Sequence, residues 1–207
     1  MSRLGMRVDL NRCIGCWACA AACKVENGTP PEVWWQTVEV VGGDTVDRST
    51  TEIAKTYRPR NCMQCADAPC IPVCPVDAIT KRPDGIVDIN ADTCIGCSKC
   101  ATACPYDAIT MHQRPDDPAN ALPVASKCNF CAPRVDAGQQ PACVDACPTN
   151  AIEFGDFGDE GLDPDHEDDP RRPERIGEEL GADPSIWFLP HTRLQDQLRS
   201  IAVPPDA

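Results

Sequence analysis

The sequence predicts an α+β fold of short helices and β-hairpins that ends in an irregular C-terminal arm. Three observations predict it. Sixteen cysteines stand in four ordered groups, and none lies after residue 147. The motif Cys-Pro-x-x-Ala-Ile occurs three times, beginning at Cys74, Cys104 and Cys147, which indicates an internal repeat. Aromatic residues make up only 5% of the chain, so large side chains alone do not fill its interior.

The third cysteine group indicates what else fills the interior. Residues 94–105 read C-x2-C-x2-C-x3-C-P, the spacing with which bacterial ferredoxins hold iron–sulfur clusters. Three thiolates on a tight loop bind three irons of a [4Fe–4S] cube, whereas the fourth cysteine of such a run binds the other cluster in two-cluster ferredoxins. One run therefore predicts a partner run. Four groups predict two ferredoxin-like double-cluster units in one chain, with four [4Fe–4S] clusters.

The four groups differ mainly in the gap between their second and third cysteines, which is 2, 4, 2 and 11 residues in chain order. The first group follows an expected strand at residues 6–10 and leads into a helix at residues 18–25. Strands at residues 76–80 and 86–89 form a hairpin with a turn at residues 83–85, and this hairpin joins the second group to the third. In the fourth group, the long gap holds a small inserted loop.

The segments outside the cysteine groups have patterns of their own. Residues 33–41 are β-branched and aromatic, which predicts a strand, and Gly42-Gly43-Asp44 predicts its hairpin turn. Residues 155–173 read as irregular acidic chain, residues 185–190 as a strand and residues 191–201 as a short helix. We interpret this stretch as an arm that packs on the core or on a partner, with a mobile tail as the alternative. The expected parts are 1–27 with 120–156 (first and fourth groups), 28–57 (a β-hairpin insertion), 58–119 (second and third groups) and 157–207 (the acidic arm).

Charge and apolar pattern exclude several classes of protein. The formal net charge of −13 at pH 7 argues against nucleic acid as a partner. The chain contains no run of about 18 apolar residues, so we expect no direct membrane span. Residues 1–11 lack a signal-peptide pattern. Nucleotide-binding and hydrolase motifs are missing, so we expect an electron carrier without a catalytic site of its own. The alternatives for the cysteines are disulfides, which need an oxidising compartment, and structural zinc, which usually takes two separated cysteine pairs.

Several segments resemble one known family, and together they cover nearly the whole chain. They are residues 23–31 with Trp34-Trp35, and residues 58–65, 127–134, 141–148, 154–156 and 180–187. In these segments and in its four cysteine groups, the chain resembles the four-cluster iron–sulfur (beta) subunits of molybdopterin oxidoreductase complexes. That family includes subunits of dimethyl sulfoxide, polysulfide, thiosulfate, tetrathionate and arsenate reductases.

The resemblance implies a function, partners and a location. The chain would relay electrons between a large molybdopterin catalytic subunit and an integral membrane subunit that reacts with quinone. It would lie peripherally on the membrane through these partners, on the cytoplasmic face or exported together with a partner that bears a signal. The alternative is a polyferredoxin-type subunit of a hydrogenase or formate-linked complex.

The resemblance also implies which cysteines share a cluster. It pairs the first group with the fourth and the second with the third, and the hairpin between the latter two predicts the same pairing for them. The implied ligand sets are Cys13, Cys16, Cys19 and Cys147; Cys62, Cys65, Cys70 and Cys104; Cys94, Cys97, Cys100 and Cys74; and Cys128, Cys131, Cys143 and Cys23.

Other residues close to these cysteines are candidates for supporting roles. Five lie within a few residues of a ligand and are candidates for tuning a cluster's reduction potential, namely Trp17, Lys24, Lys99, Lys127 and Arg134. Arg58 and Arg60 flank the second group and are candidates for docking an acidic patch on the catalytic subunit. For each basic residue, the alternative is an exposed charge that only contacts solvent.

Overall fold

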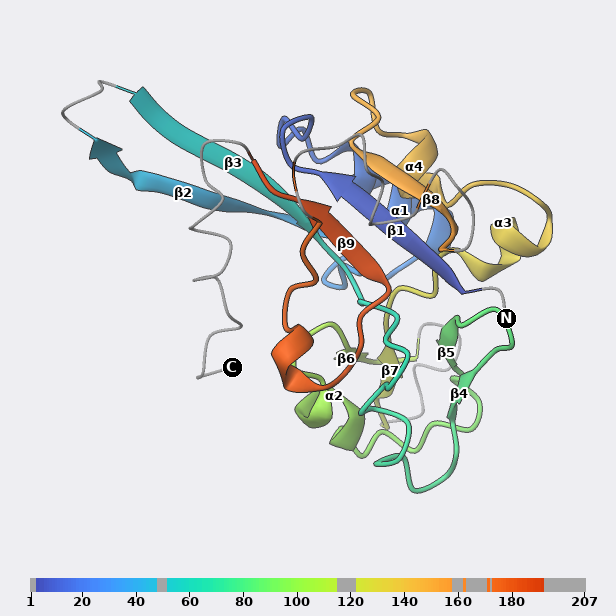
Figure 1. Ribbon diagram of the computed structural model, residues 1–207. Coiled ribbons are helices and arrows are strands. Elements are labelled where there is room, and N and C mark those ends of the chain that lie inside the picture. Colours follow the sequence, from blue (N-terminus) through green and yellow to red (C-terminus); the bar gives the residue numbers. More distant parts are fainter. Residues whose placement is uncertain are drawn as a thin grey trace.

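The structure, a computed structural model, describes residues 3–47, 52–114, 122–157, 162, 171 and 173–191 (Figure 1). It is an α+β fold with short elements. The strands are β1 (Leu4–Asp9), β2 (Thr37–Asp47), β3 (Glu52–Arg60), β4 (Ile79–Lys81), β5 (Val87–Ile89), β6 (Thr110–His112), β7 (Val124–Ser126), β8 (Ile152–Asp156) and β9 (Ile186–Leu189). The helices are α1 (Ala18–Asn27), α2 (Lys99–Ala103), α3 (Ala132–Asp136), α4 (Ala142–Asp145) and the 3-10 helix η1 (Glu178–Leu180).

A three-stranded sheet brings together distant parts of the chain. Its order is β8-β1-β9, with β8 antiparallel and β9 parallel to β1. Val8 lies opposite Ile152 on one side and Phe188 on the other, and all three side chains are buried. The sheet therefore ties the segment before the first cysteine group to the segment after the fourth, and both to the C-terminal arm (Figure 1).

The described part of the arm is built into the core. The predicted strand at residues 185–190 is observed as β9. Ser185 donates its amide hydrogen to the Met63 carbonyl at 2.8 Å and its hydroxyl hydrogen to the Gln64 carbonyl at 2.7 Å. These bonds attach the arm to the second cysteine group. The helix expected at residues 191–201 and most of the irregular chain expected at 155–173 lie outside the described residues.

Two small hairpins flank the third cysteine group. The predicted hairpin is confirmed as β4 and β5, which pair antiparallel around the turn at residues 83–85. Strands β6 and β7 form the second hairpin. Strand β7 thus pairs with β6 of the expected part 58–119. The expected boundary after residue 119 assigns β7 to the other ferredoxin-like part, residues 1–27 with 120–156.

The β2–β3 hairpin corrects two expectations. Strand β2 begins at Thr37 rather than at residue 33, and it continues through the expected turn at Gly42-Gly43-Asp44 to Asp47. The pairing register shifts between Gly42 and Val46, so the glycine pair marks a β-bulge and not the end of the strand. This hairpin extends away from the rest of the molecule (Figure 1).

Removing the Phe188 side chain tests whether the arm belongs to the core. Phe188 is fully buried, and Phe→Ala substitutions at such sites cost about 3–5 kcal/mol. We expect Phe188→Ala to lower the thermal unfolding midpoint by roughly 10 °C, measured by circular dichroism on the metal-loaded protein. Leu180→Ala is the control, because Leu180 is 50% exposed and its loss should hardly change the midpoint. Equal midpoints for the two variants would contradict this packing.

Candidate metal centres

Three apolar cavities are each surrounded by four cysteines from two different segments. Site 1 is formed by Cys13, Cys16, Cys19 and Cys147. Site 2 is formed by Cys62, Cys65, Cys70 and Cys104, and site 3 by Cys74, Cys94, Cys97 and Cys100. The remaining lining is mainly aliphatic, such as Val38 and Ile152 at site 1 and Ile79 and Ile89 at site 3.

The remaining four cysteines form a fourth group, site 4, consisting of Cys23, Cys128, Cys131 and Cys143. The Asn27 side-chain nitrogen lies 3.5 Å from Cys23 Sγ and 3.8 Å from Cys131 Sγ, so these two sulfurs are neighbours. Burial raises the pKa of Cys143 well above its usual value, and the nearby thiols of Cys128, Cys131 and Cys23 raise it further. The structure therefore brings together the same four sets that the resemblance implies.

All four groups share one backbone feature. The residue before the second cysteine has a positive φ in every group: +68° at Gly15, +47° at Gln64, +72° at Gly96 and +55° at Phe130. Glycine adopts this conformation without strain, whereas Gln64 and Phe130 adopt it despite their side chains. The tight turn is therefore a property of the cysteine loop itself, and glycine identifies only two of its four copies.

The repeated motif Cys-Pro-x-x-Ala-Ile has a specific geometry. The residue before its alanine is left-handed in all three copies, and it is Asp or Asn, which tolerate that conformation. The turn aims the alanine N–H at the sulfur four residues earlier. The resulting N···S distances are 3.3 Å for Ala78 to Cys74, 3.5 Å for Ala108 to Cys104 and 3.2 Å for Ala151 to Cys147. These N–H groups stabilise negative charge on the sulfur.

Burial works against ionisation of the thiols. It raises the pKa of Cys19 to about 11 and that of Cys65 to about 12, and neighbouring thiols add to both shifts. Cys147 is an exception: burial raises its pKa, but hydrogen bonds from the Ala151 N–H and from Thr149 lower it overall. A bound metal deprotonates such thiols because it supplies the positive charge that the site lacks.

The donor set fits a cluster better than a single ion. A zinc site needs ligands converging on one point at about 2.3 Å for sulfur. Among the described residues, no three Cys, His, Asp or Glu side chains converge in this way. All sixteen cysteines are free, so the disulfide alternative is not supported either. Four soft donors spread around a cavity match the needs of a [4Fe–4S] cube.

The sites differ in their exposure. Cys16 of site 1 and Cys97 of site 3 are exposed, and each lies in a Cys-Ile-Gly-Cys loop whose isoleucine is also exposed. All four cysteines of site 4 are buried, as are three of the four at site 2. Burial is the main reason that the pKa of Cys128 is raised, and the nearby Cys62 thiol raises it further. Because Cys62 belongs to site 2 and Cys128 to site 4, these two sites are neighbours. Cys19 of site 1 adds to the pKa shift of Cys143 at site 4, and the short segments 70–74 and 100–104 each give one cysteine to site 2 and one to site 3. The order is therefore site 1, site 4, site 2 and site 3, with the exposed cysteines in the two end sites.

Trp17 and Lys24, two of the candidate tuning residues, both contact the Trp34 ring. Trp17 lines site 1, is 46% exposed and packs edge-to-face on Trp34 with ring centroids 6.3 Å apart. Lys24 donates to the carbonyls of Pro30 at 2.6 Å and Val33 at 3.0 Å, and its Nζ lies 4.5 Å from the Trp34 ring. Lys24 therefore holds the loop that follows α1.

Among the other three candidates, only Lys127 lies in a cluster site. It is 3% exposed, lines site 2 and donates to the carbonyls of Val87 and Cys128. Burial raises the pKa of Cys65 and of Cys70, and the Lys127 charge partly offsets both shifts. Arg134 instead bridges Glu26 of α1 and Asp145 of α4, at 3.0 and 2.5 Å. Lys99 is exposed on α2.

The two docking candidates have different environments. Arg58 is 6% exposed and forms an ion pair with Glu39, so it has almost no surface with which to meet a partner. Arg58 lies opposite Glu39 across the β2–β3 hairpin, and this pairing disfavours the docking role predicted for it. Arg60 is more exposed and donates to the Tyr106 carbonyl at 2.9 Å, and its docking role stays a prediction.

Sequence reasoning missed Gln64, which links two sites. Its side chain is 1% exposed; it accepts a hydrogen bond from the Val87 N–H and donates one to the Cys128 carbonyl, both at 2.6 Å. Gln64 thus holds the second cysteine group against the fourth. The sequence did contain a signal for this role: Gln64 is polar, whereas the same loop position is glycine in two other cysteine groups.

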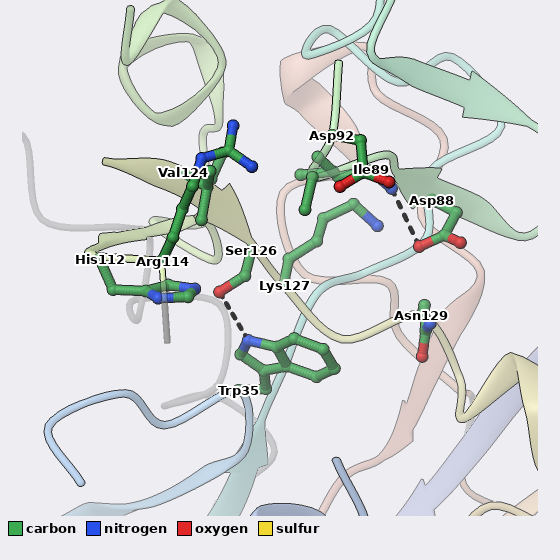
Figure 2. A pocket seen from close by; sticks show the side chains of 12 residues that line it. Trp35, Asp88, Ile89, Asp92, His112, Arg114, Val124, Ser126, Lys127 and Asn129 are labelled. Carbon is green, nitrogen blue, oxygen red and sulfur yellow. Dashed lines mark hydrogen bonds between the residues drawn. The ribbon is translucent and has the colours of Figure 1, made fainter. Parts of the chain in front are cut away.

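A wider hollow lies outside the four sites, and Figure 2 shows the side chains that line it. Its walls come from β5, β6 and β7, together with Trp35, whose ring nitrogen donates to the Ser126 hydroxyl at 2.9 Å. Arg114 on the same wall donates to the Cys94 carbonyl at 2.8 Å and so supports the site 3 loop. The lining contains no cysteine, so the hollow is not a fifth cluster site.

Two glycines with the same backbone angle test the packing of the cysteine loops. Gly96 and Gly138 both have a φ of +72°. An added Cβ at Gly96 would lie 2.4 Å from the Pro123 carbonyl oxygen, whereas at Gly138 it would meet nothing within 4 Å. We expect Gly96→Ala to lower the iron bound per chain and Gly138→Ala to leave it unchanged. Equal iron content in the two variants would show that the site 3 loop is not confined.

Comparison with known proteins agrees with this geometry. Residues 53–157 and residues 12–78 each match a family described as "4Fe-4S dicluster domain". The chain is 39% identical to one of the chains of polysulfide reductase from Wolinella succinogenes, with 92% of this chain and 96% of the relative covered. It is 33% identical to the arsenate respiratory reductase iron–sulfur subunit of a Shewanella species, with 90% and 96% covered.

A third relative, from Halobacterium salinarum, is provisionally named an iron–sulfur subunit of dimethyl sulfoxide reductase; it is 37% identical, with 91% of this chain and 79% of the relative covered. These relatives do not favour the hydrogenase or formate-linked alternative. Two dicluster domains and sixteen cysteines correspond to four [4Fe–4S] clusters. The chain therefore belongs to the family of iron–sulfur electron-transfer subunits of reductase complexes.

Proposed function

We propose that this chain relays electrons between a molybdopterin catalytic subunit and a quinone-reactive membrane subunit. The observation that carries the proposal is the order of the sites, with exposed cysteines at both ends and buried cysteines between them. Such an arrangement suits a carrier that receives electrons at one surface and delivers them at another. When bound, each cluster accepts and returns one electron.

The proposed ligands are the four cysteines that define each of sites 1 to 4. Aliphatic side chains line the sites beside the cysteines, and backbone N–H groups stabilise the charge on the sulfurs. Lys127 is the tuning candidate that we retain for site 2, because its buried ammonium acts on Cys65 and Cys70. Cysteine sharing also supports two units, residues 1–27 with 120–156 and residues 58–119, with β7 packed against the second of them through β6.

The relatives support the proposed partners, because they are named as subunits or chains of reductases. The described residues include no helix long and apolar enough to cross a membrane. We propose that the chain reaches the membrane through the quinone-reactive subunit, as the resemblance of its sequence implies. The relatives are named for polysulfide, arsenate and dimethyl sulfoxide reductases, whose substrates differ. We assign the choice of substrate to the catalytic subunit and electron relay to this chain.

Metal analysis and co-purification test the proposal directly. Each copy of this chain should bind sixteen irons and sixteen labile sulfides in the purified native complex, because each of its four cubes holds four of each. The complex should also contain a large molybdenum-bearing subunit. Stoichiometric zinc without visible absorbance would contradict the cluster assignment, and a nickel-containing partner in place of a molybdenum-containing one would contradict the assigned complex.

Loss of one ligand tests the relay. Cys100 is a buried ligand of site 3, so we expect Cys100→Ser to lose or convert one cluster while leaving three EPR signals in place. Quinol-linked turnover should fall to background, because the end site would be broken. Thr102→Ala on the same helix is the control, since its exposed hydroxyl donates to the Ser98 carbonyl at 3.4 Å and does not line the site 3 cavity. Four unchanged EPR signals and normal turnover in Cys100→Ser would contradict the assignment of Cys100 as a ligand of site 3.

A further inference from the structure

In the part of the chain that the structure describes, side-chain amides contact cysteine sulfurs at site 4 and at no other site. The Asn27 amide nitrogen lies 3.5 Å from Cys23 Sγ and 3.8 Å from Cys131 Sγ. The Asn61 amide nitrogen lies 3.6 Å from Cys128 Sγ. Two side-chain amides thus reach three of the four sulfurs. Among the described residues, the N–H donors at the other three sites all belong to the backbone, as with Ala78 at Cys74, and site 1 adds a contact of the Thr149 hydroxyl, 3.7 Å from Cys147 Sγ.

Asn27 fills a position in a repeated pattern. In the three Cys-Pro-x-x-Ala-Ile copies, the backbone N–H of the residue four places after the last cysteine points at that cysteine's sulfur. After Cys23 the chain continues as α1 instead of turning, so the backbone cannot supply this bond. Asn27 is the residue four places after Cys23, and its side chain supplies the N–H···S contact. The same nitrogen donates to the Cys23 carbonyl at 2.8 Å, which fixes the amide orientation because a carbonyl only accepts.

Asn61 reaches site 4 from the neighbouring unit. It directly precedes Cys62 of site 2, yet its side chain points to Cys128 of site 4. The Asn61 side chain is 8% exposed and Cys128 is 6% exposed. The contact therefore lies in a water-poor region, where a dipole acts on a nearby charge with little screening.

The direction of the effect follows from charge. Reduction adds one negative charge to a cluster, and hydrogen bonds to sulfur stabilise the more negative state. Donors at a buried site therefore raise its reduction potential. We propose that Asn27 and Asn61 set the reduction potential of the site 4 cluster by donating N–H···S hydrogen bonds to its cysteine sulfurs. The inference rests on the proposed ligand set of site 4.

The test is a potentiometric EPR titration of the purified complex with Asn27→Leu and Asn61→Leu. Leucine keeps the approximate size of the side chain and removes the donors. We expect one and the same signal to become harder to reduce in both variants, and the other three to keep their midpoints. At the wild-type midpoint the ratio of reduced to oxidised cluster should fall about tenfold, which is 59 mV for a one-electron couple. Asn27→Asp should shift the signal further, because it replaces a donor with a negative charge.

Asn129→Leu is the matched control. Asn129 lies directly after Cys128, but its side-chain oxygen accepts a hydrogen bond from the Ala132 N–H at 3.4 Å. It should leave all four midpoints unchanged. Sixteen irons with unshifted midpoints in Asn27→Leu, Asn61→Leu and Asn27→Asp would overturn the inference while leaving the proposed function intact. Shifts of two different signals by Asn27→Leu and Asn61→Leu would overturn the inference together with the ligand set. Absence of cluster signals in the wild-type complex would overturn the proposed function itself.

Discussion

The sharing of cysteines between distant segments is the constraint on which the rest of the structure depends. Each site takes three sulfurs from one group and its fourth from another, so no cavity is complete until two segments have met. Cys147 completes site 1 and Cys23 completes site 4, which requires the first and fourth groups to lie together. Strands β1 and β8 pair next to this junction, and α1 packs on α4. Few aromatic side chains are needed, because the cysteine loops enclose a large part of the interior.

Local signals in the sequence predicted local structure well. Cysteine spacing predicted the loops, and the turn at residues 83–85 predicted the β4–β5 hairpin, because each depends on residues close in the chain. Long-range pairings were not predictable in this way. The parallel pairing of β9 with β1 joins residues about 180 positions apart. The Gly42-Gly43 pair misled because glycine permits a bulge as readily as a turn.

Proximity to a cysteine in sequence was a weaker guide to electrostatic roles. Lys24 and Arg134 both lie close to a cysteine in the chain, yet their charged groups bind loop carbonyls and carboxylates. Neither residue lines the cavity of site 1, 2 or 3. Lys127 differs because it precedes its cysteine in an extended segment and reaches across to the neighbouring site. Uncharged Asn27 makes sulfur contacts that no search for basic residues would find.

The two buried sites are linked by side chains exchanged across their junction. Burial favours the less charged state of a cluster, so sites 2 and 4 need compensation that the exposed end sites receive from solvent. Asn61, just before the first cysteine of site 2, donates to a sulfur of site 4. Lys127 directly precedes Cys128 of site 4, and its ammonium group lies at site 2. Each unit thus supplies the other's inner site with positive charge or a donor. Separating the two units would therefore change the electrostatics of both inner sites, even if every cysteine kept its place.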